Sequence, residues 1–299
     1  MSHPGATASG PSVALVIGSG SVKCAAAIGV VKALAQEGIG INRVVGCSAG
    51  AIFAALVALG YEVEEAKEAT TRLWTKELTS SGNRKGVLQA IAPRLFGFSA
   101  ERFGLRDDGP LVRALDSFFG DRRIEDTRIP LHITATDFAN GDLVDLSTGR
   151  IADAIRASLS MPFAFAPVRV GGKLLVDGYV SDPLPVSVAI KHGARVIVAV
   201  GFESPYQENV SNAGRFAFQL SSIMSNNLLK SRFSFHSIAH HSEVIAIIPE
   251  FKQRIRLFDT SKVPYIVDEG EACAREQISY LRELLAADQP AAVPAGAVV

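Results

Sequence analysis

Residues 43–59, RVVGCSAGAIFAALVAL, carry the pattern that decides the fold. A short run rich in valine at 43–45 is followed by the pentapeptide Gly46-Cys47-Ser48-Ala49-Gly50 and then by an apolar run of helical length. This order predicts a strand, a tight turn and a helix, with Ser48 at the turn. The free backbone N–H groups at the start of the helix would face any negative charge that forms beside the Ser48 oxygen.

The G-x-S-x-G pentapeptide is short, so it arises by chance in many sequences. Its alternative interpretation is an ordinary glycine-rich turn between a strand and a helix. The predicted strand-turn-helix context favours a reactive serine, because only small residues fit two positions either side of a side chain that projects from so tight a turn.

The surrounding sequence predicts an α/β fold. Short β-branched runs alternate with helical patterns along most of the chain, which is typical of a largely parallel central sheet with helices on its faces. The expected strands are 13–17, 43–45, 131–136, 195–200 and 244–248, and the expected helices include 25–37 and one or two within 211–241. Residues 66–120 interrupt this alternation and are expected to form a helical cap.

Composition sets broad limits on the function. The 299 residues are 48% hydrophobic and carry 30 basic and 30 acidic side chains. We expect one folded domain over 12–287 between loose tails at 1–11 and 288–299, and a formal net charge of zero gives no argument for nucleic acid or for an anionic membrane. The three cysteines lack metal-type spacing and the start of the chain lacks a signal-peptide pattern, so a cytoplasmic location is expected.

A second motif follows the first expected strand. Residues 18–24, GSGSVKC, form a loop that exposes several backbone N–H groups. A dinucleotide fingerprint needs a glycine where Lys23 stands, and a phosphate-binding P-loop needs Gly-Lys followed by Ser or Thr, so neither pattern is present. The loop is instead a candidate set of donors for an oxyanion, contributed by Gly18, Ser19, Gly20, Ser21 and Lys23.

A third motif, Val176-Asp177-Gly178, follows a short apolar strand. An Asp-Gly pair is often only a turn. Asp177 is nevertheless a candidate base for Ser48, because none of the six histidines lies in an obvious triad context: His132 is expected in the core and His192 at a helix end. A carboxylate can act alone when burial raises its pKa toward the working pH.

In order along the chain, these motifs resemble the patatin-like phospholipase family. Four segments carry the resemblance, which spans roughly residues 13–285: the loop and helix at 15–34, the elbow at 46–50, ASLSMP at 157–162 and the Asp-Gly pair at 177–178. The resemblance implies a three-layer α/β/α sandwich that cleaves lipid acyl esters with a Ser-Asp dyad, without a metal or another cofactor. It assigns Ser48 as nucleophile and Asp177 as base, on a lipid ester substrate that is taken from solution or at a membrane surface.

The chain departs from the family in the oxyanion loop, where Ser19, Ser21 and Cys24 replace glycines. A non-glycine residue at positive φ is strained, so we expect a slow enzyme with Cys24 as the residue most responsible. The alternative is a lipid-binding or regulatory protein with little turnover, and a nucleotide-binding oxidoreductase is a more distant one. Phe96, Phe98 and Phe103 of the cap are expected either to contact an acyl chain or a membrane, or to form plain core.

Overall fold

The centre of the protein is one eight-stranded sheet, seen in a computed structural model that describes residues 12–79, 81–204, 206, 209–239 and 242–287. The tails predicted at 1–11 and 288–299 lie outside these residues. The strands are β1 Ser12–Ile17, β2 Gly40–Cys47, β3 Leu131–Asp137, β4 Leu143–Leu146, β5 Val168–Val170, β6 Lys173–Asp177, β7 Val196–Val200 and β8 Glu243–Ile247.

The sheet is parallel at its centre and antiparallel at one edge. Its order is β5-β6-β3-β2-β1-β7-β8, with β4 paired to β3. The pairs among β3, β2, β1, β7 and β8 are parallel, whereas β4 and β6 run antiparallel to β3, and β5 runs antiparallel to β6. The predicted α/β class with a largely parallel sheet is therefore confirmed. The short strands β4 and β5 were not expected from the sequence.

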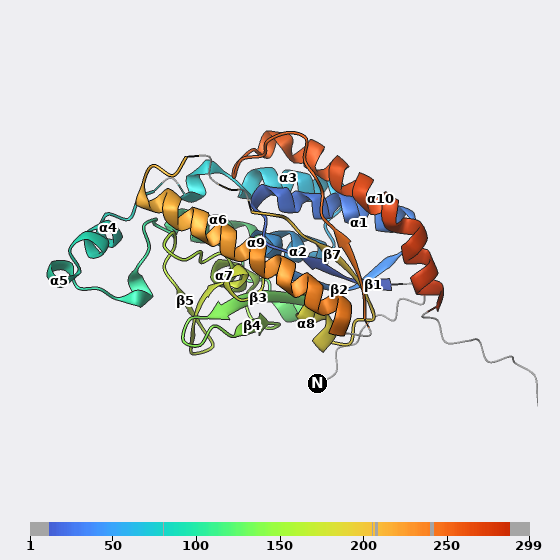
Figure 1. Ribbon diagram of the computed structural model, residues 1–299, viewed down its shortest axis with the longest axis horizontal. Helices are drawn as coiled ribbons and strands as arrows, with labels where there is room; N and C mark the ends of the chain where they lie inside the picture. The colour runs from blue at the N-terminus through green and yellow to red at the C-terminus, as the bar shows by residue number, and fades with distance from the viewer. Residues whose placement is uncertain (1–11, 80, 205, 207–208, 240–241, 288–299) are drawn as a thin grey trace, which may run out of the picture.

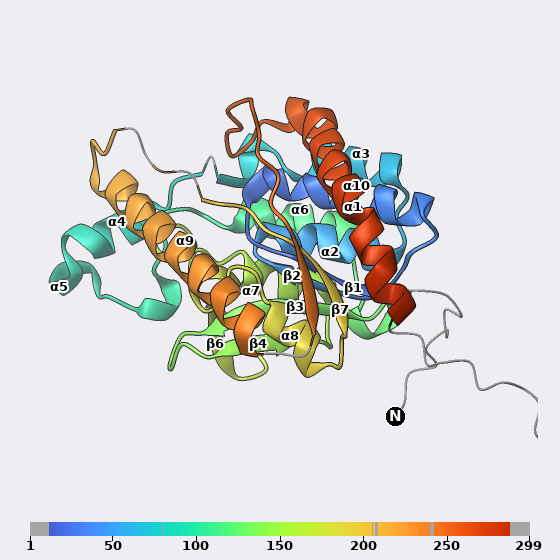
Figure 2. The same cartoon turned by 45° about the vertical axis from the view of Figure 1, so that its right-hand side comes forward.

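Helices cover both faces of the sheet (Figures 1 and 2). Alternate residues of β1 point to opposite sides: Leu15 and Ile17 join the core beneath α1, α2 and α10, while Ala14 and Val16 join a smaller core beneath α8 and α9. The helices are α1 Ala26–Gln36, α2 Ala49–Leu59, α3 Val63–Leu73, α4 Arg84–Ile91, α5 Pro93–Phe96, α6 Gly109–Phe119, α7 Ile151–Ser158, α8 Val186–Lys191, α9 Ala213–Ala239 and α10 Val263–Ala287.

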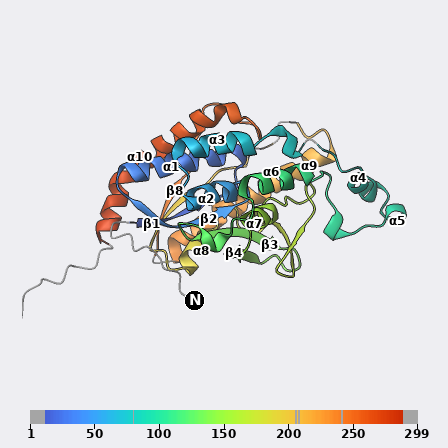
Figure 3. The same ribbon diagram turned by 180° about the vertical axis from the view of Figure 1, so that it is seen from behind.

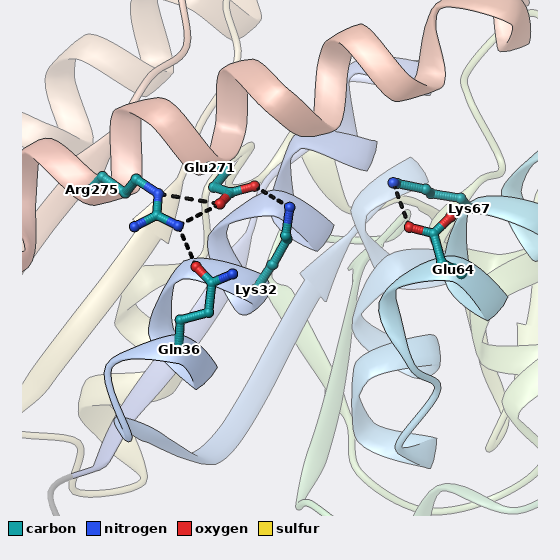
Figure 4. Close-up of polar contacts among 6 residues, drawn as sticks. All are labelled: Lys32, Gln36, Glu64, Lys67, Glu271 and Arg275. Carbon is teal, nitrogen blue, oxygen red and sulfur yellow. Dashed lines mark hydrogen bonds and ion pairs between the residues drawn. The ribbon is translucent and has the colours of Figure 1, made fainter.

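Two glycines let α1 and α10 approach each other closely. A Cβ added at Gly29 would lie 1.9 Å from the carbonyl oxygen of Val267, and one at Gly270 would lie 2.1 Å from that of Ala26. A polar cluster continues the contact beside this crossing (Figure 4). In it, Glu271 binds Lys32 Nζ at 2.6 Å and Arg275 Nη2 at 2.7 Å, and Arg275 also donates to Gln36. Small residues thus set the spacing of the two helices, and the ion pairs lie at its rim.

The segment 66–120, predicted as a cap, holds most of α3 and all of α4, α5 and α6, but α3 and α6 add buried side chains to the main core and are not part of a cap. Seen from opposite sides in Figures 1 and 3, its two short helices α4 and α5 lie at one end of the long axis, beyond the rest of the molecule. The stretch expected to hold one or two helices at 211–241 contains the single long helix α9. Among the helices of the described residues, none combines the length and apolarity needed to cross a bilayer.

Candidate active site

The pentapeptide around Ser48 forms the predicted strand-turn-helix elbow. Strand β2 ends at Cys47, α2 begins at Ala49, and Ser48 between them has φ 54° and ψ −127°. The turn needs glycines because of close contacts. A Cβ at Gly46 would lie 2.6 Å from Ala51 Cα, and a Cβ at Gly50 would lie 2.4 Å from the carbonyl oxygen of Ile17. The positive φ of Ser48 is a strained conformation for a residue with a side chain, and it is found at functional sites.

The sheet brings Ser48 and Asp177 together although 129 positions separate them. Strand β3 lies between β2 and β6, with Thr134 beside Cys47 and Ala135 beside Asp177. The side chains that follow β2 and end β6 therefore meet at the same level of the sheet. Ser48 Oγ donates a hydrogen bond to Asp177 Oδ2 at 2.7 Å.

Asp177 is fully buried and has few partners for its charge. Its Oδ1 accepts the N–H of Tyr179 at 3.1 Å, and its Oδ2 accepts the Ser48 hydroxyl. Burial raises the pKa of Asp177 to about 7, although the two hydrogen bonds act in the opposite direction. Gly178 is required next to it because a Cβ there would lie 2.5 Å from the carbonyl oxygen of Thr134. A carboxylate that titrates near neutral pH is suited to accept and return a proton.

The loop after β1 offers fewer free donors than the sequence suggested. The Gly18 N–H donates to the Val200 carbonyl at 2.9 Å and the Ser19 N–H donates to the Pro183 carbonyl at 2.8 Å. Among the described residues, the N–H groups of Gly20 and Ser21 have no acceptor. Two of the predicted oxyanion donors are therefore committed to the backbone, and Gly20 and Ser21 are the available ones.

Ser21, not Cys24, is the strained residue of this loop. Ser21 has φ 60°, and its hydroxyl donates to the Leu257 carbonyl at 3.0 Å. Cys24 lies inside the 3-10 helix Ser21–Ala25, its thiol donates to the Gly18 carbonyl at 3.3 Å, and burial raises its pKa. The expectation that Cys24 strains the loop is wrong, because helical φ is accessible to any L-residue. The side chain of Lys23, also a predicted donor, is engaged elsewhere: its Nζ donates to the Glu203 carbonyl at 3.3 Å.

Three polar residues support the site without having been singled out from the sequence. Ser158 Oγ accepts the N–H of Ser48 at 2.8 Å and donates to the Thr134 carbonyl at 2.7 Å. Two backbone carbonyls hold the end of β6 in place. The Ser160 carbonyl accepts the Asp177 N–H at 3.0 Å, and the Asp177 carbonyl accepts the Thr136 hydroxyl at 2.9 Å. Ser158 and Ser160 belong to the segment 157–162, which the sequence marked only by resemblance.

Cys47 completes the elbow as a buried residue. Its thiol donates to the carbonyl of Asp182 at 3.4 Å, and burial raises the thiol pKa well above its ordinary value. A neutral thiol in this position packs the turn against the segment after Asp177, so the oxygen of Ser48, and not the sulfur of Cys47, is the candidate nucleophile.

Two of the histidines gather around one carboxylate away from Ser48. His132 Nδ1 lies 2.9 Å and His192 Nε2 lies 2.8 Å from Asp145 oxygens, near the start of β3. Among the described residues these three form the one group able to offer three ligand atoms to a metal ion. Arg43 contributes a positive charge there. His3, His240, His241 and the side chain of His236 lie outside the described residues.

Comparison with known proteins places the chain in a family. A family model described as patatin-like phospholipase matches residues 15–190. An uncharacterised NTE family protein of Mycobacterium tuberculosis is 34% identical over 192 residues, which cover 64% of this chain and 49% of that protein. The patatin-like phospholipase domain-containing protein 7 of Mus musculus is 30% identical over 211 residues, which cover 69% of this chain and 14% of that protein.

The chain thus spans about half the length of the mycobacterial relative, and a smaller share of the mouse protein. The solved structure of VipD from Legionella pneumophila overlaps 93% of this chain and 67% of its own, with a TM-score of 0.49 and 14% identity. The matched residues 15–190 make up more than half of the sequence and include Ser48 and Asp177. The chain belongs to the patatin-like phospholipase family.

Proposed function

We propose that this protein is a serine acyl hydrolase that cleaves the acyl esters of lipids. Ser48 is the nucleophile and Asp177 is its base. The observation that carries the proposal is the 2.7 Å hydrogen bond from a strained serine to a buried carboxylate. The raised pKa of Asp177 and the membership of the family support it further.

The reaction proceeds in two steps. Asp177 Oδ2 takes the proton of the Ser48 hydroxyl as Oγ bonds to the acyl carbon, and the electron pair of the carbonyl moves onto its oxygen. The tetrahedral intermediate collapses, the alcohol leaves with the proton from Asp177, and an acyl-enzyme remains. Water then attacks the acyl carbon and gives a proton to Asp177. The fatty acid departs, and that proton returns to Ser48.

The developing negative charge is stabilised by backbone donors. Gly20 and Ser21 supply N–H groups from the loop after β1, and the start of α2 adds the N–H of Ala49, whereas the Ala51 N–H donates to the Ser48 carbonyl at 2.9 Å. Gly20 is needed because a Cβ there would lie 2.4 Å from the ring of Phe202. A larger residue would move the donors away from the Ser48 oxygen.

The second candidate function is a lipid-binding or regulatory protein with little turnover. It is favoured by the engagement of the Gly18 and Ser19 amides and by the positive φ of Ser21. Reaction with a fluorophosphonate separates the two functions, because the reagent bonds only to an activated serine. We expect one adduct on the peptide that contains Ser48 and none in Ser48→Ala. A folded protein that forms no adduct would favour the binding function.

A further inference from the structure

The strongest feature outside the catalytic centre is the segment 83–105, called here the arm. An isolated bridge between Gly82 and Arg106 closes its base, and α4 and α5 form its outer part. Its own polar groups order it: Asn83 Oδ1 accepts the Gly86 N–H at 3.0 Å, and Gln89 Nε2 donates to the Gly97 carbonyl at 2.8 Å. Figures 1, 2 and 3 all show α4 and α5 projecting at one end of the molecule.

The arm exposes apolar side chains that a purely structural role would bury. Leu95 is 82% exposed, Ile91 76% and Phe98 56%. Val87, Leu88 and Phe96 are also exposed. These side chains are neighbours in a short segment, and such a concentration marks an interaction site. The possibility that the cap aromatics form plain core is therefore excluded for Phe96 and Phe98.

The arm is also strongly basic, although the whole chain has no net charge. It contains four basic residues, Arg84, Lys85, Arg94 and Arg102, and one acidic residue, Glu101, which gives a net charge of +3. Glu101 pairs with Arg169 of β5. All four basic side chains are exposed, and in the part of the chain that the structure describes none of them forms a salt bridge. Exposed apolar residues flanked by Arg and Lys suit an anionic lipid surface.

An aromatic path connects the arm to the catalytic centre. Phe98 and Phe103 have ring centroids 5.2 Å apart, and Phe103 meets Phe163 at 6.5 Å. The Leu105 N–H donates to the Phe163 carbonyl at 2.9 Å. Phe163 lies in the loop after α7, where the Ser160 carbonyl holds the Asp177 N–H. A surface bound by the arm would therefore meet the protein next to the segment that supports the base.

The beginning of α9 extends the same surface. Its exposed apolar residues Phe216, Leu220, Ile223 and Met224 recur at helical spacing. The helix has no Asp or Glu along its 27 residues. In Figures 1, 2 and 3 its N-terminal part lies at the end of the molecule from which the arm projects.

We propose that the arm docks the protein on the surface of an anionic bilayer. Ile91, Leu95 and Phe98 enter the interface between head groups and acyl chains, while Arg84, Lys85 and Arg94 contact the anionic head groups. The purpose of docking rests on the proposed lipid hydrolysis, because docking brings the ester bonds of the bilayer to Ser48. The binding itself is independent of turnover.

The test measures sedimentation of the full chain with vesicles of diether phosphatidylcholine, with or without about one third diether phosphatidylglycerol. Ether lipids have no ester for the protein to cleave, so binding is observed alone. The double variant Ile91→Glu/Leu95→Glu should bind anionic vesicles at least about tenfold more weakly. Tyr280→Glu, at a 48% exposed residue of α10, is the matched control and should bind as the unmodified protein does.

A second variant tests the charge. The variant Arg84→Gln/Lys85→Gln/Arg94→Gln should lose affinity for the anionic vesicles. Added salt should weaken vesicle binding by the unmodified protein more than binding by this variant. Both multiple variants should hydrolyse a short soluble ester at the normal rate and melt at the normal temperature, because the altered side chains are exposed.

The outcomes separate docking from catalysis. Vesicle binding that depends on the arm supports docking even if no ester is cleaved, in which case the proposed hydrolysis alone fails. Equal binding by the unmodified protein and the Ile91→Glu/Leu95→Glu variant would overturn docking, whatever the hydrolysis of soluble esters. Absence of vesicle binding, with self-association that the same variant abolishes, would overturn it in favour of a second copy as the partner.

Discussion

At the scale of single residues, Ser48 and Asp177 should act as one unit. Their hydrogen bond makes each useful only in the presence of the other. Ser48→Ala and Asp177→Asn should each reduce kcat on a short activated ester by about 10³-fold or more, and the double variant should be little worse than either. Steady-state kinetics of the three variants check this. Near-normal turnover by Asp177→Asn would eliminate Asp177 as the base.

The buried carboxyl also predicts how activity depends on pH. Because burial raises the pKa of Asp177 to about 7, kcat/KM should rise about tenfold per pH unit below 7 and level off above it. In the proposed mechanism the ionised carboxylate is the base, so kcat/KM increases with pH. A profile measured on a neutral ester checks this, and a plateau that extends down to pH 5 would contradict it.

The same pKa predicts that Asp177 lowers stability. The group binds its proton more tightly when folded than at its ordinary pKa of 3.8, so stability is greatest below 3.8 and declines as pH rises toward 7. Asp177→Asn should therefore increase the free energy of unfolding by about 1–2 kcal/mol at pH 8, below the ceiling of about 4 kcal/mol that three pKa units represent. It should have little effect near pH 4. Thermal melts at the two pH values test this, and an equal change at both would argue against a buried charge.

The oxyanion loop gives a third prediction at this scale. Ser21→Ala keeps the strained backbone but removes the hydroxyl that binds the Leu257 carbonyl, so kcat should fall about tenfold with little change in KM. Cys24→Gly should not increase kcat, because Cys24 has helical φ, and it should lower stability because it empties a buried position. A faster Cys24→Gly enzyme would restore the original expectation that Cys24 limits the loop.

At the scale of elements, the contact of α1 with α10 depends on two glycines. Gly270→Ala would place a Cβ 2.1 Å from the Ala26 carbonyl oxygen, which forces the helices apart. The free energy of unfolding should fall by about 2–3 kcal/mol in urea denaturation. Gly214→Ala in α9, where the nearest atom to the added Cβ is 3.4 Å away, is the matched control and should be neutral or slightly stabilising. Equal stability of the two variants would show that α10 can move without loss.

At the scale of the whole molecule, the site should work without a metal ion. In the proposed mechanism, Ser48 and Asp177 supply the nucleophile and the base, and backbone amides stabilise the developing charge. We expect hydrolysis of a soluble ester to survive EDTA. The group formed by His132, Asp145 and His192 makes the result informative, because it is a possible ligand set elsewhere in the protein. Activity lost to EDTA and restored by zinc would contradict the proposed mechanism.

Features that depend on neighbouring residues could be predicted from the sequence alone. The strands 13–17 and 131–136, the long helix within 211–241 and the elbow at Ser48 follow from side-chain periodicity and from turn chemistry, which act over a few positions. The sequence also picked out Ser48 and Asp177 as a candidate pair, because each lies in a local motif and the order of these motifs resembles a family.

Features that depend on segments brought together from far apart could be seen only in the tertiary structure. The roles of Ser158 and Ser160 arise because β3 lies between β2 and β6, and this order is not written in any local pattern. The loop amides of Gly18 and Ser19 are occupied by carbonyls about 165 to 180 positions away, and the positive φ of the loop lies at Ser21 and not at Cys24. From the sequence, Phe96, Phe98 and Phe103 were expected to contact an acyl chain or a membrane, with plain core as the alternative, whereas the structure leaves Phe96 and Phe98 exposed and Phe103 partly buried. Burial depends on what packs against a residue, and the sequence states only what that residue is.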